Sequence, residues 1–259
     1  MNPPYLNVTL PAHNEEAQLA ASVERVAIFL DEQGWRWELV IAENGSRDRT
    51  GEIADRLAAE TRGPKPDAGC QTPDGATRVE EAGRCAGGVV RVRHRAMPGR
   101  GAALREAWLG SEADLVSYMD VDLSTDLGCL PALLAPLQDG RADVAVGSRL
   151  LPGSHTTRGW RRDLISRGYN RLLRVALGLR VRDAQCGFKA LTRTAAQALL
   201  PQVRDEGWFF DTELLVLAQR GGWRTAEVPV RWADDPGSTV RLLPTVWRDL
   251  RGIGRLRRW

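Results

Sequence analysis

Short apolar runs alternate with longer amphipathic stretches along the first half of the chain. The apolar runs predict strands at residues 6–10, 37–42, 89–92 and 115–119. The amphipathic stretches predict helices at residues 15–33, 50–60, 101–110 and 127–137. This alternation is typical of a mostly parallel sheet that is covered by helices on both faces. The pattern therefore predicts an α/β fold.

The pattern changes at two points along the chain. Residues 61–88 are rich in Gly, Pro, Asp and Thr and show no periodicity, so we expect a mobile surface insertion there. After Gly147 the helical segments become rich in arginine. The second half predicts strands at 143–146 and 225–230, helices at 160–179, 194–200 and 209–220, and a tail at 244–259.

Composition and charge exclude several classes of protein. With 43% hydrophobic and 27% charged residues, the chain of 259 residues can bury a core and is not disordered. Its 36 basic and 33 acidic residues give a net charge of +3, which is too balanced for a protein that coats nucleic acid, so no nucleic-acid partner is expected. No window reaches the roughly 18–20 apolar residues of a membrane span, and no signal-peptide pattern is seen. We expect a cytoplasmic protein with reduced cysteines.

Two carboxylates follow the most apolar of the predicted strands. Asp120 and Asp122 come directly after residues 115–119, with Val121 between them. In an open α/β sheet ligands bind at the carboxyl ends of the strands, and in an extended chain residues i and i+2 point the same way. Both carboxylates can therefore face one divalent cation that holds the phosphates of a nucleotide. The alternative is that they only end the strand and cap the next helix.

Polar turns follow two further strands, and a glycine-rich segment opens a helix. In the turn at 11–16, Asn14 is placed to cap a helix, and Glu15 and Glu16 suit its positive end. The turn at 43–50 offers polar side chains where a base and a ribose can be hydrogen-bonded. Residues 98–105 put glycines and Arg100 at a helix start, as an anion site does. This segment lacks a full GxGxxG and a GKS/T motif, which disfavours dinucleotide and P-loop sites.

The order of these motifs resembles that of a known enzyme family. The segments LPAHNEE, ENGSRDRT, GRGAALREA and DVDLSTD are similar to motifs of the inverting family 2 glycosyltransferases of GT-A fold. The later segments GSR, ISRGYN, DAQCGFK, WFFDTELL and EVPV resemble the polyprenyl-phosphate hexose synthases, the group of dolichyl-phosphate β-glucosyltransferases and dolichol-phosphate mannose synthases. The resemblance covers nearly the whole chain except 61–88. Two departures stand out, because ENGS replaces the usual DDGS and Arg100 replaces the usual lysine.

The resemblance implies a metal-dependent transfer of a hexose, with inversion, from a nucleotide sugar (UDP-glucose or GDP-mannose) to polyprenyl or dolichyl phosphate. It implies that Asp120 and Asp122 hold Mg²⁺ or Mn²⁺, and that Asp122 takes part in catalysis. The donor is expected to contact Pro11, Ala12, Asn14, Glu15, Glu16, Glu43, Asn44, Ser46, Arg100, Gly101, Arg105, Asp120 and Val121. The acceptor phosphate is expected to contact Arg149, Arg161, Arg162 and Ser166. We interpret residues 1–259 as a single domain with a nucleotide-sugar-binding half at 1–150, an acceptor-side half at 151–240 and a basic amphipathic tail at 241–259.

The nature of the acceptor decides whether a catalytic base is needed. A phosphate monoester is already largely anionic at neutral pH, because its second pKa lies near ~6, whereas a hydroxyl must lose a proton. Asp211 and Glu213 are candidate catalytic bases for a soluble hydroxyl acceptor such as a small natural product. Otherwise they are structural partners of arginines. A non-catalytic subunit that binds a nucleotide sugar is a third interpretation.

The tail has apolar residues at helical spacing, arginines, and tryptophans near its two ends. Such a segment suits an amphipathic helix at the inner face of an anionic membrane, so we expect peripheral membrane contact. A helix that packs on the domain with its charged side in water fits the pattern equally well.

Overall fold

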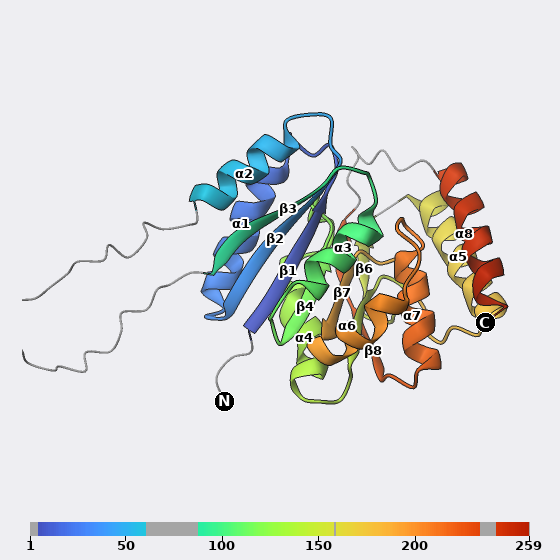
Figure 1. The fold of residues 1–259 in the computed structure, drawn as a ribbon. Coiled ribbons are helices and arrows are strands. Elements are labelled where there is room, and N and C mark those ends of the chain that lie inside the picture. Colours follow the sequence, from blue (N-terminus) through green and yellow to red (C-terminus); the bar gives the residue numbers. More distant parts are fainter. Residues whose placement is uncertain (1–4, 61–87, 158, 234–241, 259) are drawn as a thin grey trace, which may run out of the picture.

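The computed structural model describes residues 5–60, 88–157, 159–233 and 242–258, without the side chains of Arg161, Arg162 and residues 242–248 (Figure 1). The main sheet contains β1 Tyr5–Ala12, β2 Arg36–Asn44, β3 Val89–Arg95, β4 Leu115–Met119, β5 Val144–Ser148, β7 Phe188–Thr192 and β8 Thr225–Pro229. A small second sheet pairs β6 His155–Thr157 with β9 Arg231–Ala233. The helices are α1 Leu19–Glu32, α2 Thr50–Glu60, α3 Arg100–Leu109, α4 Leu130–Gln138, α5 Trp160–Leu177, α6 Arg193–Leu199, α7 Phe210–Arg220 and α8 Leu242–Leu256, with short 3₁₀ turns at Leu127–Cys129 and Leu200–Gln202.

The strand order of the main sheet is β3-β2-β1-β4-β7-β5-β8. All neighbours pair in parallel except β7, which runs antiparallel to β4 and to β5. The sequence pattern did not predict β7, because its run of apolar residues is interrupted by Lys189, which is fully buried. The antiparallel direction of β7 brings the residues that precede it to the edge where β4 ends.

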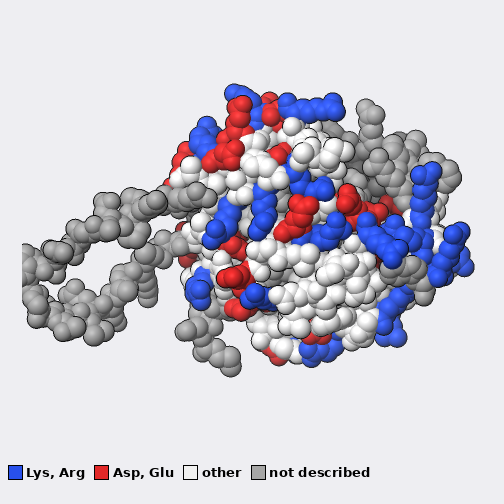
Figure 2. Space-filling model, in the orientation of Figure 1, with Lys and Arg blue, Asp and Glu red and all other residues white. Residues whose placement is uncertain are grey.

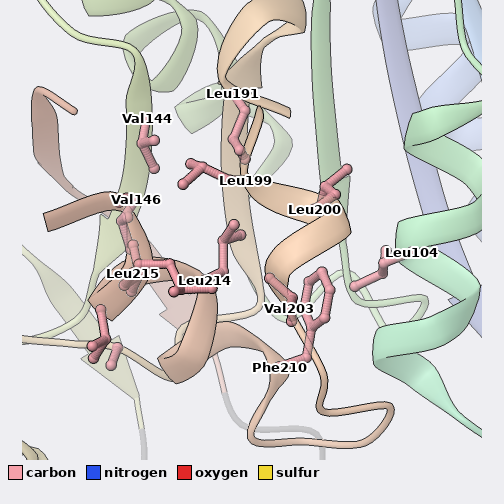
Figure 3. Close-up of a cluster of buried hydrophobic side chains, with 14 of the residues drawn as sticks. Leu104, Val144, Val146, Leu191, Leu199, Leu200, Val203, Phe210, Leu214 and Leu215 are labelled. Carbon is pink, nitrogen blue, oxygen red and sulfur yellow. The ribbon is translucent and has the colours of Figure 1, made fainter. Parts of the chain in front are cut away.

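Helices cover both faces of the sheet, so the predicted α/β architecture is confirmed (Figure 1). Strand side chains alternate between the faces, and in β1 Leu6, Val8 and Leu10 all join one core cluster. That cluster includes side chains of α1, α2 and α4. The other face buries a second cluster with side chains of α3, α5, α6, α7 and α8. Figure 3 shows part of it, with Leu104 of α3, Leu199 of α6 and Phe210 of α7.

Several boundaries differ from the sequence prediction. Helix α1 begins at Leu19 rather than at residue 15. Helix α5 ends at Leu177, where Gly178 takes a left-handed φ of 65° that favours glycine. The expected insertion at 61–88 lies outside the described residues apart from Gly88. Within the described ranges, no helix is both long and apolar enough to span a bilayer.

Candidate active site

The candidate site lies at the edge of the sheet where β1, β2 and β4 end. Strand β7 begins at the same edge, because Phe188 pairs with Met119, the last residue of β4. The turns after β1, β2 and β4 and the segment before β7 therefore meet there. In open α/β sheets this edge is where ligands bind.

Reciprocal hydrogen bonds join the turn after β1 to the turn after β2. Asn14 donates its backbone N–H to Ser46 Oγ at 3.1 Å, and Asn14 Oδ1 accepts the Arg47 N–H at 2.8 Å. Asn14 has a left-handed φ of 58°, a conformation that asparagine tolerates better than most residues. The prediction that Asn14 caps α1 is wrong, since its side chain bonds to the second turn and the helix begins only at Leu19.

Glu15 and Glu16 lie just before α1, whose first turn contains no acidic residue, whereas the sequence placed them at the start of the helix. Burial raises the pKa of Glu15 above its usual value, and the nearby charges of Asp122 and Asp120 raise it further, against the effect of a hydrogen bond from Gln18. Glu15 is therefore close to the two carboxylates after β4. Glu16 is exposed and accepts the Arg49 backbone N–H at 3.1 Å, which adds to the junction between the two turns.

The side chains of Glu43 and Asn44, expected near the nucleotide, are bonded within the protein. Glu43 Oε1 accepts the Ser46 N–H at 2.7 Å, and Glu43 Oε2 lies 3.1 Å from His94 Nδ1. Burial raises the pKa of Glu43, but the bonds from Ser46 and His94 outweigh burial and leave it below its usual value. Asn44 Nδ2 donates to the last carbonyl of β1 at 2.8 Å, and its Oδ1 accepts the Gly99 N–H at 3.1 Å. Both side chains hold the turns in place.

Three other residues expected to contact the nucleotide sugar reach the site mainly through their backbone atoms. Pro11 and Ala12 end β1, and Ala12 is fully buried. Val121 is also buried, and its carbonyl accepts Ser22 Oγ of α1 at 2.6 Å. The side chains of Ala12 and Val121 pack in the core beside α1.

The start of α3 is covered by protein, so it does not form the open anion site that the glycines suggested. The Glu206 carbonyl accepts the Gly101 N–H at 2.8 Å. A Cβ on Gly101 would lie 2.5 Å from Phe210 Cβ, so the glycine is required for close packing against α7. Arg105 donates to the Val203 carbonyl at 2.9 Å and lies 3.4 Å from Glu206 Oε1. Gly101 and Arg105 therefore hold the loop at 203–209.

Arg100 lies at the centre of the site and is almost fully buried. Its guanidinium lies over the rings of Tyr118 and Trp208, 4.8 Å from each centroid. Nη2 is 2.8 Å from Asp120 Oδ1, and Nη1 is 2.7 Å from Asp211 Oδ2. Among the described residues, the buried Nε has no hydrogen-bond partner. Arg100 thus links the carboxylate after β4 to the first turn of α7.

Asp211 is a buried carboxylate with three donors. Lys189 Nζ lies 2.9 Å from its Oδ1, the Tyr118 hydroxyl donates to the same oxygen, and Arg100 binds the other. Burial raises the pKa of Asp211, but the charges of Lys189 and Arg100 outweigh burial and leave the pKa below its usual value. A carboxylate held in this way is a poor proton acceptor.

Glu213 is also fully buried and faces protein donors. Its Oε2 accepts the Asp205 N–H at 2.7 Å, the Arg204 N–H at 3.2 Å and Arg255 Nη2 at 2.8 Å. These bonds tie α7 to the loop at 203–209 and to α8. The sequence alternative that Asp211 and Glu213 pair with basic groups agrees with this geometry.

Asp120 and Asp122 follow β4 in a tight turn rather than in the extended chain that the sequence argument assumed. The turn closes with a bond from the Leu123 N–H to the Asp120 carbonyl at 3.1 Å. Asp122 Oδ1 accepts the Ser124 N–H at 2.9 Å. A Cβ on Gly187 would lie only 1.8 Å from Asp120 Oδ2, so only glycine leaves room for this carboxylate.

The residues after β4 fit a divalent cation with few protein ligands. Carboxylate oxygens are the ligands that Mg²⁺ and Mn²⁺ prefer. Within the described part of the chain, no group of three or more His, Cys, Asp and Glu residues could hold a metal. Asp120 and Asp122 would therefore act as a pair, with donor phosphates and water completing the coordination, as is common for Mg²⁺.

Arg149, the leading candidate for the acceptor phosphate, is held by a buried carboxylate. Its Nε and Nη2 lie 2.7 and 2.9 Å from the two oxygens of Asp183, which is fully buried. Burial raises the pKa of Asp183, but the charge of Arg149 outweighs it and leaves the pKa below its usual value. The third guanidinium nitrogen of Arg149, Nη1, takes no part in these two bonds to Asp183. The guanidinium is 5.5 Å from the centre of the Trp232 ring, which further fixes its orientation.

Ser166, expected beside Arg149, lies on α5 one turn before Asn170. The Ser166 carbonyl accepts Asn170 Nδ2 at 3.0 Å, and Asn170 Oδ1 accepts the Ala184 N–H beside Asp183 at 2.9 Å. This chain of bonds connects Ser166 to the Arg149 pair. Arg161 and Arg162 belong to α5, but their side chains lie outside the described part.

Sequence reasoning gave no role to Lys189, Asp183, Gly187, Trp208 or His94, all of which shape the site. Gly187 and Lys189 belong to the GFK segment where β7 begins, and Asp183 lies four residues before that segment. Lys189 interrupts an otherwise apolar run, which alone does not distinguish a buried lysine from an exposed one, and the pattern gave no separate signal for Asp183 or Gly187. Nothing in the sequence pattern brings His94 to Glu43, because that contact depends on the register of β2 and β3.

Comparisons with known proteins agree on one family. The family model described as Glycosyl transferase family 2 matches residues 8–67 and 71–200. Glycosyltransferase AglD of Haloferax volcanii is 38% identical over 98% of this chain and 37% of its own length. The dolichyl-phosphate beta-glucosyltransferases of Drosophila melanogaster and Saccharomyces cerevisiae are 29% and 26% identical over 91% and 92% of this chain, and these matches cover 69% and 70% of their lengths. This chain thus spans little more than a third of AglD.

Solved structures support the fold. Glucosyl-3-phosphoglycerate synthase from Mycobacterium tuberculosis, in complex with UDP, gives a TM-score of 0.59 at 21% identity and covers 98% of this chain and 79% of its own. Its complex with Mn²⁺, UDP and phosphoglyceric acid gives 0.62 at 21% identity, with 98% and 77% coverage. This likeness confirms the expected GT-A fold. With a family match over most of the chain, and the family's motifs gathered at one edge of the sheet, the protein belongs to glycosyl transferase family 2.

Proposed function

We propose that this protein is a hexosyltransferase that transfers a hexose from a nucleotide sugar, UDP-glucose first and GDP-mannose second, to polyprenyl or dolichyl phosphate. One observation carries the choice of acceptor. Asp211 and Glu213, the candidate bases, are buried, and each is bonded to at least three donors of the protein. A phosphate acceptor needs cations more than a base, so this arrangement favours a phosphate over a hydroxyl.

The donor side is supplied by the turns after β1, β2 and β4. We expect Asp120 and Asp122 to hold Mg²⁺ or Mn²⁺ with the donor diphosphate, and the bound ion would offset charge on the leaving nucleoside diphosphate. Arg100, 2.8 Å from Asp120, adds a positive charge on the same side. An acceptor phosphate oxygen then attacks the anomeric carbon while the bond to the diphosphate breaks, so no proton has to be removed.

The acceptor side is supplied by Arg149 and α5. Next to Arg149, Leu150 lines a groove of about 540 Å³ beside α5. Its other lining residues are Leu164, Arg167, Gly168, Arg171, Arg174 and Arg182. Cations along an apolar wall suit a phosphate that is joined to a hydrocarbon chain. The names of the dolichyl-phosphate beta-glucosyltransferases among the relatives support the same acceptor class.

Helix α5 also supports peripheral contact with a membrane. It exposes large apolar side chains at Trp160, Leu164, Ile165, Leu172 and Val175. In Figure 2, Lys and Arg side chains gather at the end of the molecule where α5 and α8 lie. Exposed apolar side chains with flanking arginines favour an anionic lipid surface. Helix α8 buries Ile253 and Leu256 in the core, so we now propose that α5, rather than the tail, makes this contact.

The test is transfer from radiolabelled UDP-glucose and GDP-mannose to dolichyl phosphate in vesicles, with and without Mn²⁺. We expect a metal-dependent product that partitions into an organic extract. Reactions that contain a water-soluble alcohol in place of dolichyl phosphate are the control. Product on the soluble alcohol alone would contradict the choice of acceptor.

A further inference from the structure

His94 connects three elements around the turn after β2. It lies on the edge strand β3, in register with Glu43 on β2. His94 Nδ1 is 3.1 Å from Glu43 Oε2, and Nε2 is 2.9 Å from Asp55 Oδ1 on α2. Glu43 in turn accepts the Ser46 N–H with its other oxygen. A line of contacts therefore runs from α2 through His94 and Glu43 to the turn that faces the β1 turn.

Only the imidazolium form satisfies both contacts of His94. Each ring nitrogen faces a carboxylate oxygen, and a neutral imidazole has only one N–H to donate. The other group of α2 near the ring is Gly51, whose added Cβ would lie 3.7 Å from the ring, so it brings no charge. The flanking Arg93 and Arg95 bond elsewhere, to the Gly110 carbonyl and to Glu106. Both charged groups that contact the ring are therefore carboxylates.

The pKa of His94 responds to these neighbours. The hydrogen bond to Asp55 raises it, burial lowers it, and the bond to Glu43 raises it again, so the pKa lies above its usual value of 6.5. The side chain is 44% exposed and can exchange its proton with water. His94 is therefore fully protonated below its usual pKa of 6.5, and it loses this charge as the pH rises through its raised pKa in the folded protein.

We propose that protonated His94 is a positioning residue, which holds Glu43 and thereby fixes the 43–46 turn in the shape that binds the nucleotide sugar. Loss of its proton removes one of the two bonds and loosens the turn, which weakens donor binding at high pH. This inference rests on the proposed function, because it takes the 43–46 turn as part of the donor site.

The test measures the dissociation constants of UDP-glucose and GDP-mannose by calorimetry from about pH 6 to pH 9. We expect binding to weaken about fivefold across the titration of His94, as for a partly exposed ion pair. Asp55→Asn removes one carboxylate and should move the midpoint to lower pH. His94→Gln should give weak binding with no such midpoint. The matched control is Glu52→Gln, which removes a charge from an exposed side chain of the same helix and should leave the midpoint unchanged.

A second measurement separates this inference from the proposed function. Hydrogen exchange of the Ser46 amide, which donates to Glu43, reports on the turn without any donor. We expect the protection of the Ser46 amide to fall as His94 loses its proton, and NMR of the imidazole measures that titration. In His94→Gln the protection should be low at every pH. Failure of both donors to bind would contradict the proposed donor while this readout still decides the role of His94. The inference would be overturned if the midpoint of donor binding were unchanged in Asp55→Asn, or if the protection of the Ser46 amide did not change as His94 titrates.

Discussion

Replacing Asp211 by Asn separates a structural role from a catalytic one. The side chain is 4% exposed, and its oxygens face Arg100 at 2.7 Å and Lys189 at 2.9 Å. The variant keeps the shape but removes the negative charge, so Lys189 is left buried beside an amide. Removing one partner of a buried ion pair costs about 3–5 kcal/mol, a large part of the ~5–15 kcal/mol that stabilises a typical domain.

The assay is urea unfolding at neutral pH together with initial rates for the folded protein. We expect a loss of about 3–5 kcal/mol in the free energy of unfolding, and a rate per folded molecule that falls less than about tenfold. Asp139→Asn is the matched control, because Asp139 pairs with Arg141 at 2.9 Å on the surface, with side chains 56% and 66% exposed. That change should cost at most about 1 kcal/mol.

The pH dependence gives the same prediction an independent check. The folded pKa of Asp211 lies below its usual 3.8, so its contribution is fully present above that value. The contribution is lost as the pH falls through the lower folded pKa, and the gap in stability between the native protein and Asp211→Asn should close in acid. A rate loss of about 10²–10⁴ without a loss of stability would instead identify a base and refute the structural reasoning.

Three further predictions concern other parts of the site. Gly187→Ala should push Asp120 from its position, since the added Cβ would lie 1.8 Å from Oδ2, and should raise the Mn²⁺ concentration for half-maximal activity about tenfold, as measured by metal titration. Val175→Asp on α5 removes an apolar contact and adds a negative charge, so sedimentation with anionic vesicles should fall about fivefold or more; equal binding to neutral and anionic vesicles by the native protein would contradict this. Burial raises the pKa of Cys186 to about 12, so iodoacetamide at neutral pH should not label this thiol until urea unfolds the protein, which mass spectrometry can follow.

Much of the fold was predictable because the strands that alternate with helices carry regular apolar patterns. Strand β7 was missed because Lys189 interrupts its apolar run, and no local rule tells a buried lysine from an exposed one. The partner that explains it, Asp211, is far away in the sequence, and the antiparallel placement of β7 that brings the two together is a property of the whole sheet.

The candidate site was predictable in its location and less so in the roles of its residues. The motifs gather at the expected edge, but Asn14 bonds to the turn after β2 and Glu43 bonds to the Ser46 amide of its own turn, because the turns need partners for their backbone groups. The sequence suggested that Gly101 helps to form an anion site, whereas a glycine is required there because α3 packs closely against Phe210. Such packing distances depend on elements that meet only after folding.

Strand β7 also couples folding to chemistry. Its alternation sends Lys189 to Asp211, whereas Phe188 and Ala190 on either side join the opposite core cluster. A slip of one residue in its pairing with β4 would bury Lys189 among the apolar side chains of α1 and α4 and pull Gly187 away from Asp120. A misregistered sheet would therefore lose both its charge balance and the position of Asp120, the carboxylate that we propose holds the metal. Catalytic competence thus serves as a direct report on whether the strands have aligned during refolding.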